Sequence, residues 1–160
     1  MHIDLELPNS PRAWVLGLNA LTQVNRAIVL GNPAFPFLYY TPVIYQRERK
    51  EIWKTCDAIL RDGFDDCDGL STWRAGELEA AGWLAVFPFE EAYELAQAYQ
   101  PETIAARVVL EQTGTRLFHA ITRYQIVVDG DVYEFTDDPS ARLGMLGKVA
   151  PEIKELRYAR

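Results

Sequence analysis

Histidine and cysteine are scarce in this chain. Among 160 residues there are two histidines, His2 and His119, and two cysteines, Cys56 and Cys67. Two cysteines do not make a disulfide framework, so we expect both to be reduced thiols inside a cell. A mechanism that needs an imidazole therefore has almost no choice of residue.

Long apolar runs and an excess of basic residues are lacking too. The 16 basic and 23 acidic side chains give a formal charge of -7, which argues against nucleic acid as a partner because phosphate binding needs a dense basic face. No apolar run reaches the roughly 18 residues of a membrane-spanning helix. The opening residues, MHIDLELP, carry acids where a signal peptide carries lysine or arginine. We therefore expect neither a secretion signal nor a membrane partner.

Most of the chain is patterned for regular structure. An apolar share of 49% excludes a disordered chain. Residues 3–7 alternate between apolar and acidic, which predicts a short strand. Apolar residues then recur at helical spacing, which predicts helices over residues 10–30, 48–61, 66–82 and 89–99. In the second of these helices the mixed-sign run 47–51 is interpreted as a solvated face, and Cys56, in mid-helix, as a core residue.

The last third of the chain favours strands. β-Branched and aromatic residues are frequent there, and Asp129-Gly130 is a typical two-residue hairpin turn. The pattern predicts an antiparallel meander over residues 104–110, 117–128 and 132–136, then a last helical turn or two over 151–158. Helices followed by a meander predict an α+β domain.

Cys67 is the first candidate for chemistry. It lies in Asp65-Asp66-Cys67-Asp68, at the predicted start of a helix. Unpaired backbone N–H groups and the helix dipole favour a thiolate at that position, whereas the neighbouring carboxylates disfavour it. The sequence leaves the balance open. A simply buried thiol is the structural alternative.

His119 and Asp138 come together through the register of the hairpin. With Asp129-Gly130 as the turn, Asp138 lies opposite Ile121 and is a diagonal neighbour of His119 on the same face. Asp137 then points to the opposite face. A histidine in mid-strand with one hydrogen bond is the structural alternative.

Together these residues have the logic of a Cys-His-Asp triad. The imidazole of His119 takes the proton of Cys67, the carboxylate of Asp138 fixes the tautomer, and the thiolate attacks an acyl carbon. The donor for the resulting oxyanion is not identified by spacing. The candidates upstream of Cys67 are Gln46, Tyr45 and Trp53, of which Tyr45 and Trp53 favour structural roles.

Several segments resemble transglutaminase-like cysteine proteins, above all small members of that superfamily from tailed-phage and prophage genomes. Asp66-Cys67-Asp68 is similar to the nucleophile segment, and His119-Ala120 and Asp138-Pro139-Ser140 to the His and Asp segments. The similarity covers residues 37–147. Its other shared positions are Leu38-Tyr39, Val43, Tyr45, Glu48, Trp53, Leu70, Trp73-Arg74, Glu77-Leu78 and Leu143-Gly144-Met145.

The chain departs from this family pattern at three positions and in the length of one connecting segment. Asp65 stands where the family has glycine, Gly69 where it has an acid, and Asp137 where it often has glutamate. Residues 83–103 exceed the usual spacing between the Cys helix and the His strand.

The resemblance implies a papain-like core, in which the Cys helix packs on the sheet that bears His and Asp. It implies one transglutaminase-like domain over residues 1–160, with an N-terminal extension (1–36), a core (37–147) and a C-terminal tail (148–160). The implied function is that of a thiol enzyme, which is either a hydrolase (a cysteine peptidase or amidase) or a transamidase. Such an enzyme would use Cys67, His119 and Asp138 and would need no cofactor or metal. The expected partner is a protein or peptide substrate, phage structural proteins included, in the bacterial host cytoplasm or the phage virion.

Two alternatives remain open at this point. One is a catalytically silent phage virion structural or assembly protein, because a fold does not fix a function. The other is a zinc site of His2, Cys56, Cys67 and His119, which lacks any short paired-ligand spacing.

Overall fold

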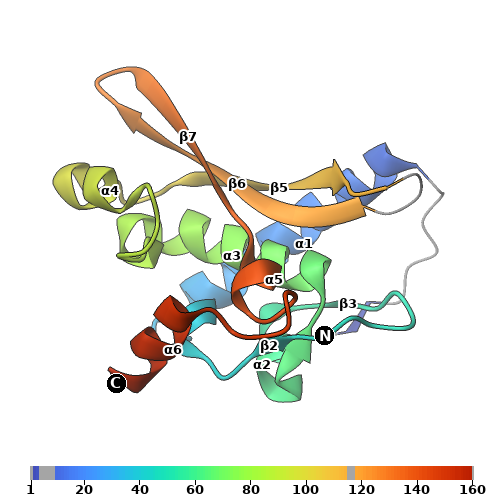
Figure 1. Ribbon diagram of the computed structural model, residues 1–160. Coiled ribbons are helices and arrows are strands. Elements are labelled where there is room, and N and C mark those ends of the chain that lie inside the picture. The colour runs from blue at the N-terminus through green and yellow to red at the C-terminus, as the bar shows by residue number, and fades with distance from the viewer. Residues whose placement is uncertain (1, 4–9, 115–117, 160) are drawn as a thin grey trace.

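The molecule is built from one antiparallel sheet and a layer of helices beneath it. The computed structural model describes residues 2–3, 10–114 and 118–159. In Figure 1 the sheet lies above α3 and most of α1, α4 lies at the left at about the height of β5, and a second group of shorter elements lies below α3. This mixed architecture confirms the predicted α+β class.

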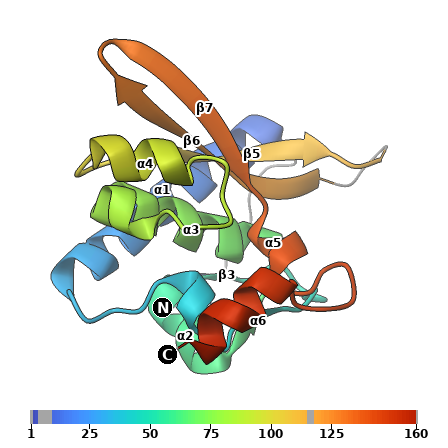
Figure 2. The ribbon, with the colours of Figure 1, turned by 60° about the vertical axis from the view of Figure 1, so that its left-hand side comes forward.

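The sheet consists of β5 (Ala105–Gln112), β6 (Phe118–Val128) and β7 (Asp131–Asp137), with β6 in the centre. Asp129 and Gly130 form the β6–β7 turn with φ of 51° and 91°, the left-handed geometry of a type I′ hairpin. Thr122 consequently pairs with Asp137, which confirms the predicted register. Figure 2 shows this hairpin extending beyond α4.

Helix α3 (Cys67–Ala81) is the centre of the molecule, and residues 68–78 are all buried. It packs against the sheet and against α1 (Pro11–Gly31), and a Cβ added at Gly76 would lie 2.9 Å from the Asn25 Cβ and the Arg26 nitrogen. Glycine is therefore needed for the close approach of the two helices. Both helices confirm the prediction, with boundaries within a residue or two.

The second group of elements joins segments that are distant in the sequence. Strand β1 (His2–Ile3) pairs with β3 (Trp53–Lys54), and β2 (Ile44–Tyr45) runs parallel to β4 (Phe64–Asp65). The remaining elements are η1 (Leu38–Tyr40), α2 (Cys56–Asp62), η2 (Gly82–Ala85), α4 (Tyr93–Tyr99), α5 (Pro139–Arg142) and α6 (Pro151–Tyr158). Helix α6 confirms the last predicted helical turns.

The helix predicted over residues 48–61 is wrong in its first half. Helix α2 begins at Cys56, and the chain before it is extended through β3. Lys54 is buried there and forms ion pairs with Glu48 and with Asp65, at 3.5 Å. Residues 47–51 lie outside the helices of the structure, so this run is not a helix face. Cys56 is the first residue of its helix rather than a mid-helix residue, although its burial is confirmed.

Two further predictions differ in extent. The helix predicted over residues 89–99 begins only at Tyr93, after two turns. Of the strand predicted over residues 3–7, Ile3 is in β1 and residues 4–7 lie outside the described part of the chain. None of the helices that the structure describes has the length and apolarity needed to span a bilayer.

Candidate active site

Cys67 is the first residue of α3, directly after an extended N-cap residue, Asp66. Its side chain is partly buried, whereas Cys56 is fully buried, and both are free thiols. Because the first backbone N–H groups of a helix have no partner within it, Cys67 lies where negative charge can be stabilised.

The sheet edge beside Cys67 is open because β7 ends too early to cover it. β7 ends at Asp137, opposite Thr122, so the earlier residues of β6 have no β7 partner. Helix α3 takes this place: the Ser71 hydroxyl donates to the Ala120 carbonyl over 2.9 Å, and the Thr122 hydroxyl donates to the Ser71 carbonyl over 3.0 Å. The backbone of Ala120 also hydrogen-bonds the Cys67 thiol. The thiol is thus held beside the residue that follows His119.

His119 and Asp138 are in direct contact. His119 Nε2 lies 2.8 Å from Asp138 Oδ2, and the other carboxylate oxygen accepts the backbone N–H of Ala141 over 3.1 Å. Asp138 thereby caps α5, so its orientation is fixed from both sides. The predicted pairing of His119 with Asp138 rather than Asp137 is confirmed. With Nε2 facing Asp138, Nδ1 is the ring nitrogen left for a thiol.

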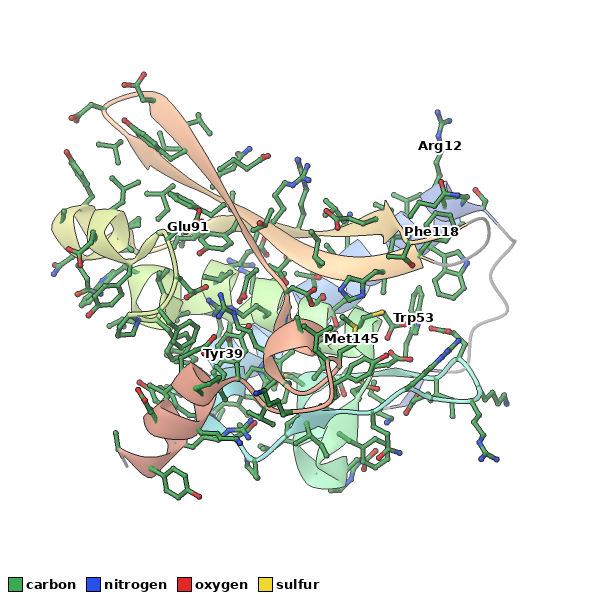
Figure 3. The ribbon with its side chains drawn as sticks, viewed as in Figure 1. Arg12, Tyr39, Trp53, Glu91, Phe118 and Met145 are labelled. Carbon is green, nitrogen blue, oxygen red and sulfur yellow. The ribbon has the colours of Figure 1, made fainter. Side chains whose placement is uncertain are left out.

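Cys67, His119 and Ala120 line one cavity of about 620 Å³. Apolar side chains from α1, from the β5 and β6 strands and from the loop after α5 form much of its wall: Pro11, Trp14, Leu18, Leu110, Phe118 and Met145. The labelled Phe118 and Met145 mark this part of the molecule in Figure 3. The residues that carry the thiol and the imidazole therefore share one cavity.

The thiol of Cys67 is protonated at neutral pH. Burial, with smaller contributions from the carboxylates of Asp66 and Glu51, raises its pKa to about 11, although the hydrogen bond from the Ala120 backbone acts in the opposite direction. The start of the helix was expected to lower the pKa of this thiol and the neighbouring carboxylates to raise it. Burial and the neighbouring charges together outweigh the effect of the helix terminus. Burial raises the pKa of the Cys56 thiol to about 12.

Of the three predicted oxyanion donors, Tyr45 is the one that lines the cavity. The parallel β2–β4 pairing sets Tyr45 beside Asp65, two residues before Cys67. Burial raises the pKa of the Tyr45 phenol, and Cys67 contributes to the same shift, so the phenol lies near the thiol. Gln46 is exposed, and Trp53 is buried and donates its indole N–H to Glu51 over 3.1 Å. Trp53 thus has the structural role expected of it.

Two of the departures from the family pattern compensate each other in space. A Cβ at Gly69 would lie 1.8 Å from Asp65 Oδ2. The carboxylate of Asp65 therefore occupies the space that a side chain at position 69 would need. Neither oxygen of Asp65 accepts a hydrogen bond, and Lys54 Nζ lies 3.5 Å from Oδ1.

A buried ion network behind the site was missed by sequence reasoning. Arg74 is fully buried and donates to Asp137 over 2.8 Å, to Glu77 over 2.6 Å and to Glu90 over 2.6 Å. Tyr39, labelled in Figure 3, donates its hydroxyl to the same oxygen of Asp137 over 2.6 Å. The sequence did contain a sign of this network. Arg74 and Glu77 lie three residues apart in a helix whose other residues pack inward, which is typical of a buried ion pair.

This network positions the end of β7. Arg142 donates to the second oxygen of Asp137 over 2.8 Å, and the neighbouring guanidinium groups hold the pKa of this carboxyl below its usual range. Asp137 is thus fixed on the inner face of the sheet. Its neighbour Asp138 is held on the side where it meets His119.

No group of three or more His, Cys, Asp or Glu residues in the described part of the chain is arranged to hold a metal ion. Cys56 is sealed in the core, where its backbone N–H donates to Asn25 Oδ1 over 2.8 Å. The side chain of His2 lies outside the described residues.

Comparisons with protein-family models, with curated proteins and with solved structures found no match for this chain.

Proposed function

We propose that this protein is a thiol enzyme that transfers or hydrolyses the acyl group of an amide or ester, with Cys67 as nucleophile, His119 as base and Asp138 as the residue that orients the base. One observation carries this proposal: His119, which contacts Asp138 at 2.8 Å, lines the same cavity as the free thiol of Cys67. Nucleophile, base and orienting group are the parts that acyl transfer through a covalent intermediate requires.

The reaction proceeds through an acyl-enzyme. His119 removes the proton from Cys67 Sγ as the sulfur attacks the acyl carbon, and the C=O electron pair moves to oxygen. When the C=O bond re-forms, the amine or alkoxide leaves and takes the proton from the imidazolium. Water or a second amine then resolves the thioester by the same steps. Because the resting thiol of Cys67 is protonated, proton removal by His119 accompanies attack.

The oxyanion is stabilised from two sides. The backbone N–H of Cys67 lies at the first position of α3 and has no partner within the helix. Tyr45, which the parallel β2–β4 pairing sets beside Asp65, lines the same cavity, and its hydroxyl is the second donor. Loss of one such donor slows acyl transfer by about 100- to 1000-fold in other enzymes.

The resemblance to transglutaminase-like cysteine proteins supports this assignment and, with it, a papain-like core. Cys67 begins a helix that packs on β6, which bears His119, and His119 contacts Asp138 just after β7, as the resemblance implies. The closer similarity to small phage members supports a location in the host cytoplasm or the virion, with a protein or peptide as substrate. On this proposal the site needs no cofactor.

A second candidate function is supported by the charge around the thiol. Burial and the carboxylates of Asp66 and Glu51 disfavour the thiolate, as expected if the chain kept the fold and lost turnover. On this reading it is a structural or assembly protein of a phage virion.

Alkylation by iodoacetamide separates the two functions. At neutral pH we expect Cys67 to react faster than Cys56, and His119→Ala to abolish the difference, because a positioned base contributes about 100-fold or more. Glu111→Ala is the matched control: it changes the exposed residue opposite His119 on β5 and leaves the rate unchanged. Equally slow labelling of both thiols by peptide mass spectrometry favours the structural protein.

A further inference from the structure

Helix α1 supplies an apolar wall of the cavity that contains Cys67. Pro11, Trp14 and Leu18 of this helix all line the cavity. They follow one another at intervals of three and four residues, so they lie on one face of the helix. The first two turns of α1 therefore present one apolar face to the cavity.

The ends of β5 and β6 supply a second apolar wall. Leu110 pairs with Ala120 in the sheet, and Phe118 lies two residues before Ala120, so the three side chains share one face of the sheet. All three residues line the cavity. Helix α1 packs against β5, and Leu18, Ala120, Trp14 and Leu110 belong to one apolar cluster. A helix face and a sheet face thus bound this part of the cavity.

Exposure increases along both walls in the same order. On α1, Leu18 is buried, Trp14 is partly buried and the first residue of the helix is exposed. On the strands, Ala120 is buried, Leu110 is partly buried and Phe118 has 46% of its surface exposed. The apolar part of the cavity therefore has a closed inner end at Leu18 and Ala120 and an open mouth at Phe118.

The thiol of Cys67 lies at the inner end. The backbone of Ala120 hydrogen-bonds the thiol, and the Cys67 side chain packs against the same apolar cluster. An acyl group attacked by this thiol consequently has apolar walls beside it that lead outward to the mouth. Because burial of apolar surface is favourable, a large apolar group attached close to the acyl carbon fits this space.

The rest of the cavity lining is polar and favours a peptide over a plain hydrocarbon chain. Tyr45, Arg47 and Glu51, from the segment before α2, and Asp66, directly before α3, line the same cavity. A peptide brings main-chain amide groups for the polar part and a side chain for the apolar part. A hydrocarbon chain brings only the second. The lining as a whole therefore matches an apolar residue within a peptide.

We propose that Trp14 and Leu18 of α1, with Leu110 and Phe118 of the sheet, form a subsite for a large apolar side chain, such as phenylalanine or leucine, in the peptide whose acyl group Cys67 attacks. The proposal rests on the proposed acyl-transfer function for its place in the reaction. The α1 wall lies outside residues 37–147, so the resemblance to transglutaminase-like proteins does not imply this subsite.

A binding titration without turnover tests the proposal. In the Cys67→Ala protein, N-acetylphenylalaninamide is compared with N-acetylalaninamide and with N-acetylglutaminamide, whose side chain is long but polar. The ¹H–¹⁵N shifts of the Trp14 indole and the Ala120 amide report binding. We expect the phenylalanine probe to bind about tenfold tighter than either of the others, because it buries a large apolar side chain.

Three outcomes of this titration would overturn the proposal. They are equal affinities for the three probes, tighter binding of the glutamine probe, and no binding of any probe. Hexanamide is the arm for a hydrocarbon chain outside a peptide. Tighter binding of hexanamide than of N-acetylphenylalaninamide overturns the assignment to a peptide side chain.

Two cavity variants and one control locate the subsite. Leu110→Ala removes part of the strand wall and is expected to lower the ratio of phenylalanine-probe to alanine-probe affinity by about threefold, with little change in the alanine probe. Phe118→Ala, at the exposed mouth, does the same even if Leu110→Ala impairs folding. Val132→Ala, an exposed apolar position near the β6–β7 turn, is the control and leaves the ratio unchanged.

An unchanged ratio in both cavity variants overturns the proposal, because a general disturbance of the fold would weaken both probes alike. Acyl transfer plays no part in this readout. Failure of the subsite and failure of the proposed enzyme are therefore distinguishable.

Discussion

Asp137 and Asp138, at the end of β7, are neighbours in the sequence but have different partners. This difference leaves Asp138 in contact with His119 at the candidate site. Asp137 faces inward to Arg74 and Arg142, whereas Asp138 meets His119 at 2.8 Å. The alternation follows from the pleat of a strand. It was predictable from sequence because a two-residue turn fixes the register of both strands.

The pairing of Asp65 with Gly69 gives a stability prediction. Gly69→Ala places a methyl group against the buried carboxylate of Asp65 and is expected to lower the free energy of unfolding by about 1–3 kcal/mol. The double variant Asp65→Ala/Gly69→Ala should recover most of this loss in urea denaturation. Gly114→Ala, where a Cβ meets no atom within 4 Å, is the control. A Gly69→Ala protein as stable as the control would contradict the account.

Asp65 also predicts a dependence of stability on pH. Burial raises its pKa to about 8, whereas an unfolded aspartate titrates near pH 4, at about 3.9. Between these values the folded protein binds the proton more tightly. The stabilisation is therefore complete below about pH 4 and is lost as pH rises toward 8, by at most about 1.4 kcal/mol per pH unit.

Urea denaturation across this range measures that slope. Compared with wild type, Asp65→Asn should remove the decline, and Asp129→Asn at the exposed hairpin turn should not. A slope that is the same in all three proteins would show that Asp65 is ionised throughout.

Among the helices and strands, the sequence predicted the bounds well where a hydrophobic period runs over many residues. It predicted the wrong element where buried ion pairs determine the backbone conformation. Helix α3 (Cys67–Ala81) and the β6–β7 hairpin were predicted closely, because their patterns run for many residues. Residues 48–55 carry helix-compatible side chains, yet the burial of Lys54 among three carboxylates holds them extended. Such tertiary contacts leave no periodic signal.

The buried network that joins α3 to β7 gives a prediction at this scale. Arg74→Met leaves Glu77, Glu90 and Asp137 without their shared cation, and removal of one partner from a buried ion group costs about 3–5 kcal/mol. Urea denaturation should show this loss. Arg107→Met is the matched control because Arg107 is exposed and pairs with Glu134 at 3.6 Å, which is worth less than about 1 kcal/mol. Equal losses in the two variants would show that the network does not stabilise the fold.

In the whole molecule, segments that are distant in the sequence together form the cavity. The sequence patterns did not predict that these segments meet. Helix α1 and the loop after α5 contribute Trp14 and Met145, although more than a hundred residues separate them. Residues 1–36, expected as an extension, thus supply part of the cavity wall through α1. The parallel β2–β4 pairing, which brings Tyr45 to Cys67, was likewise not predicted, because two-residue strands carry no period. The His119–Asp138 contact was predictable, since one hairpin turn sets the register of the two strands.

The acyl-enzyme that we propose at Cys67, formed with the help of His119, can be observed directly by acylation with p-nitrophenyl acetate. Intact and peptide mass spectrometry should find one acetyl group on Cys67 and none on Cys56, formed much more slowly in His119→Ala and Asp138→Asn. Absence of acetylated Cys67 in the wild-type protein, or its formation at the same rate in His119→Ala, would contradict the account.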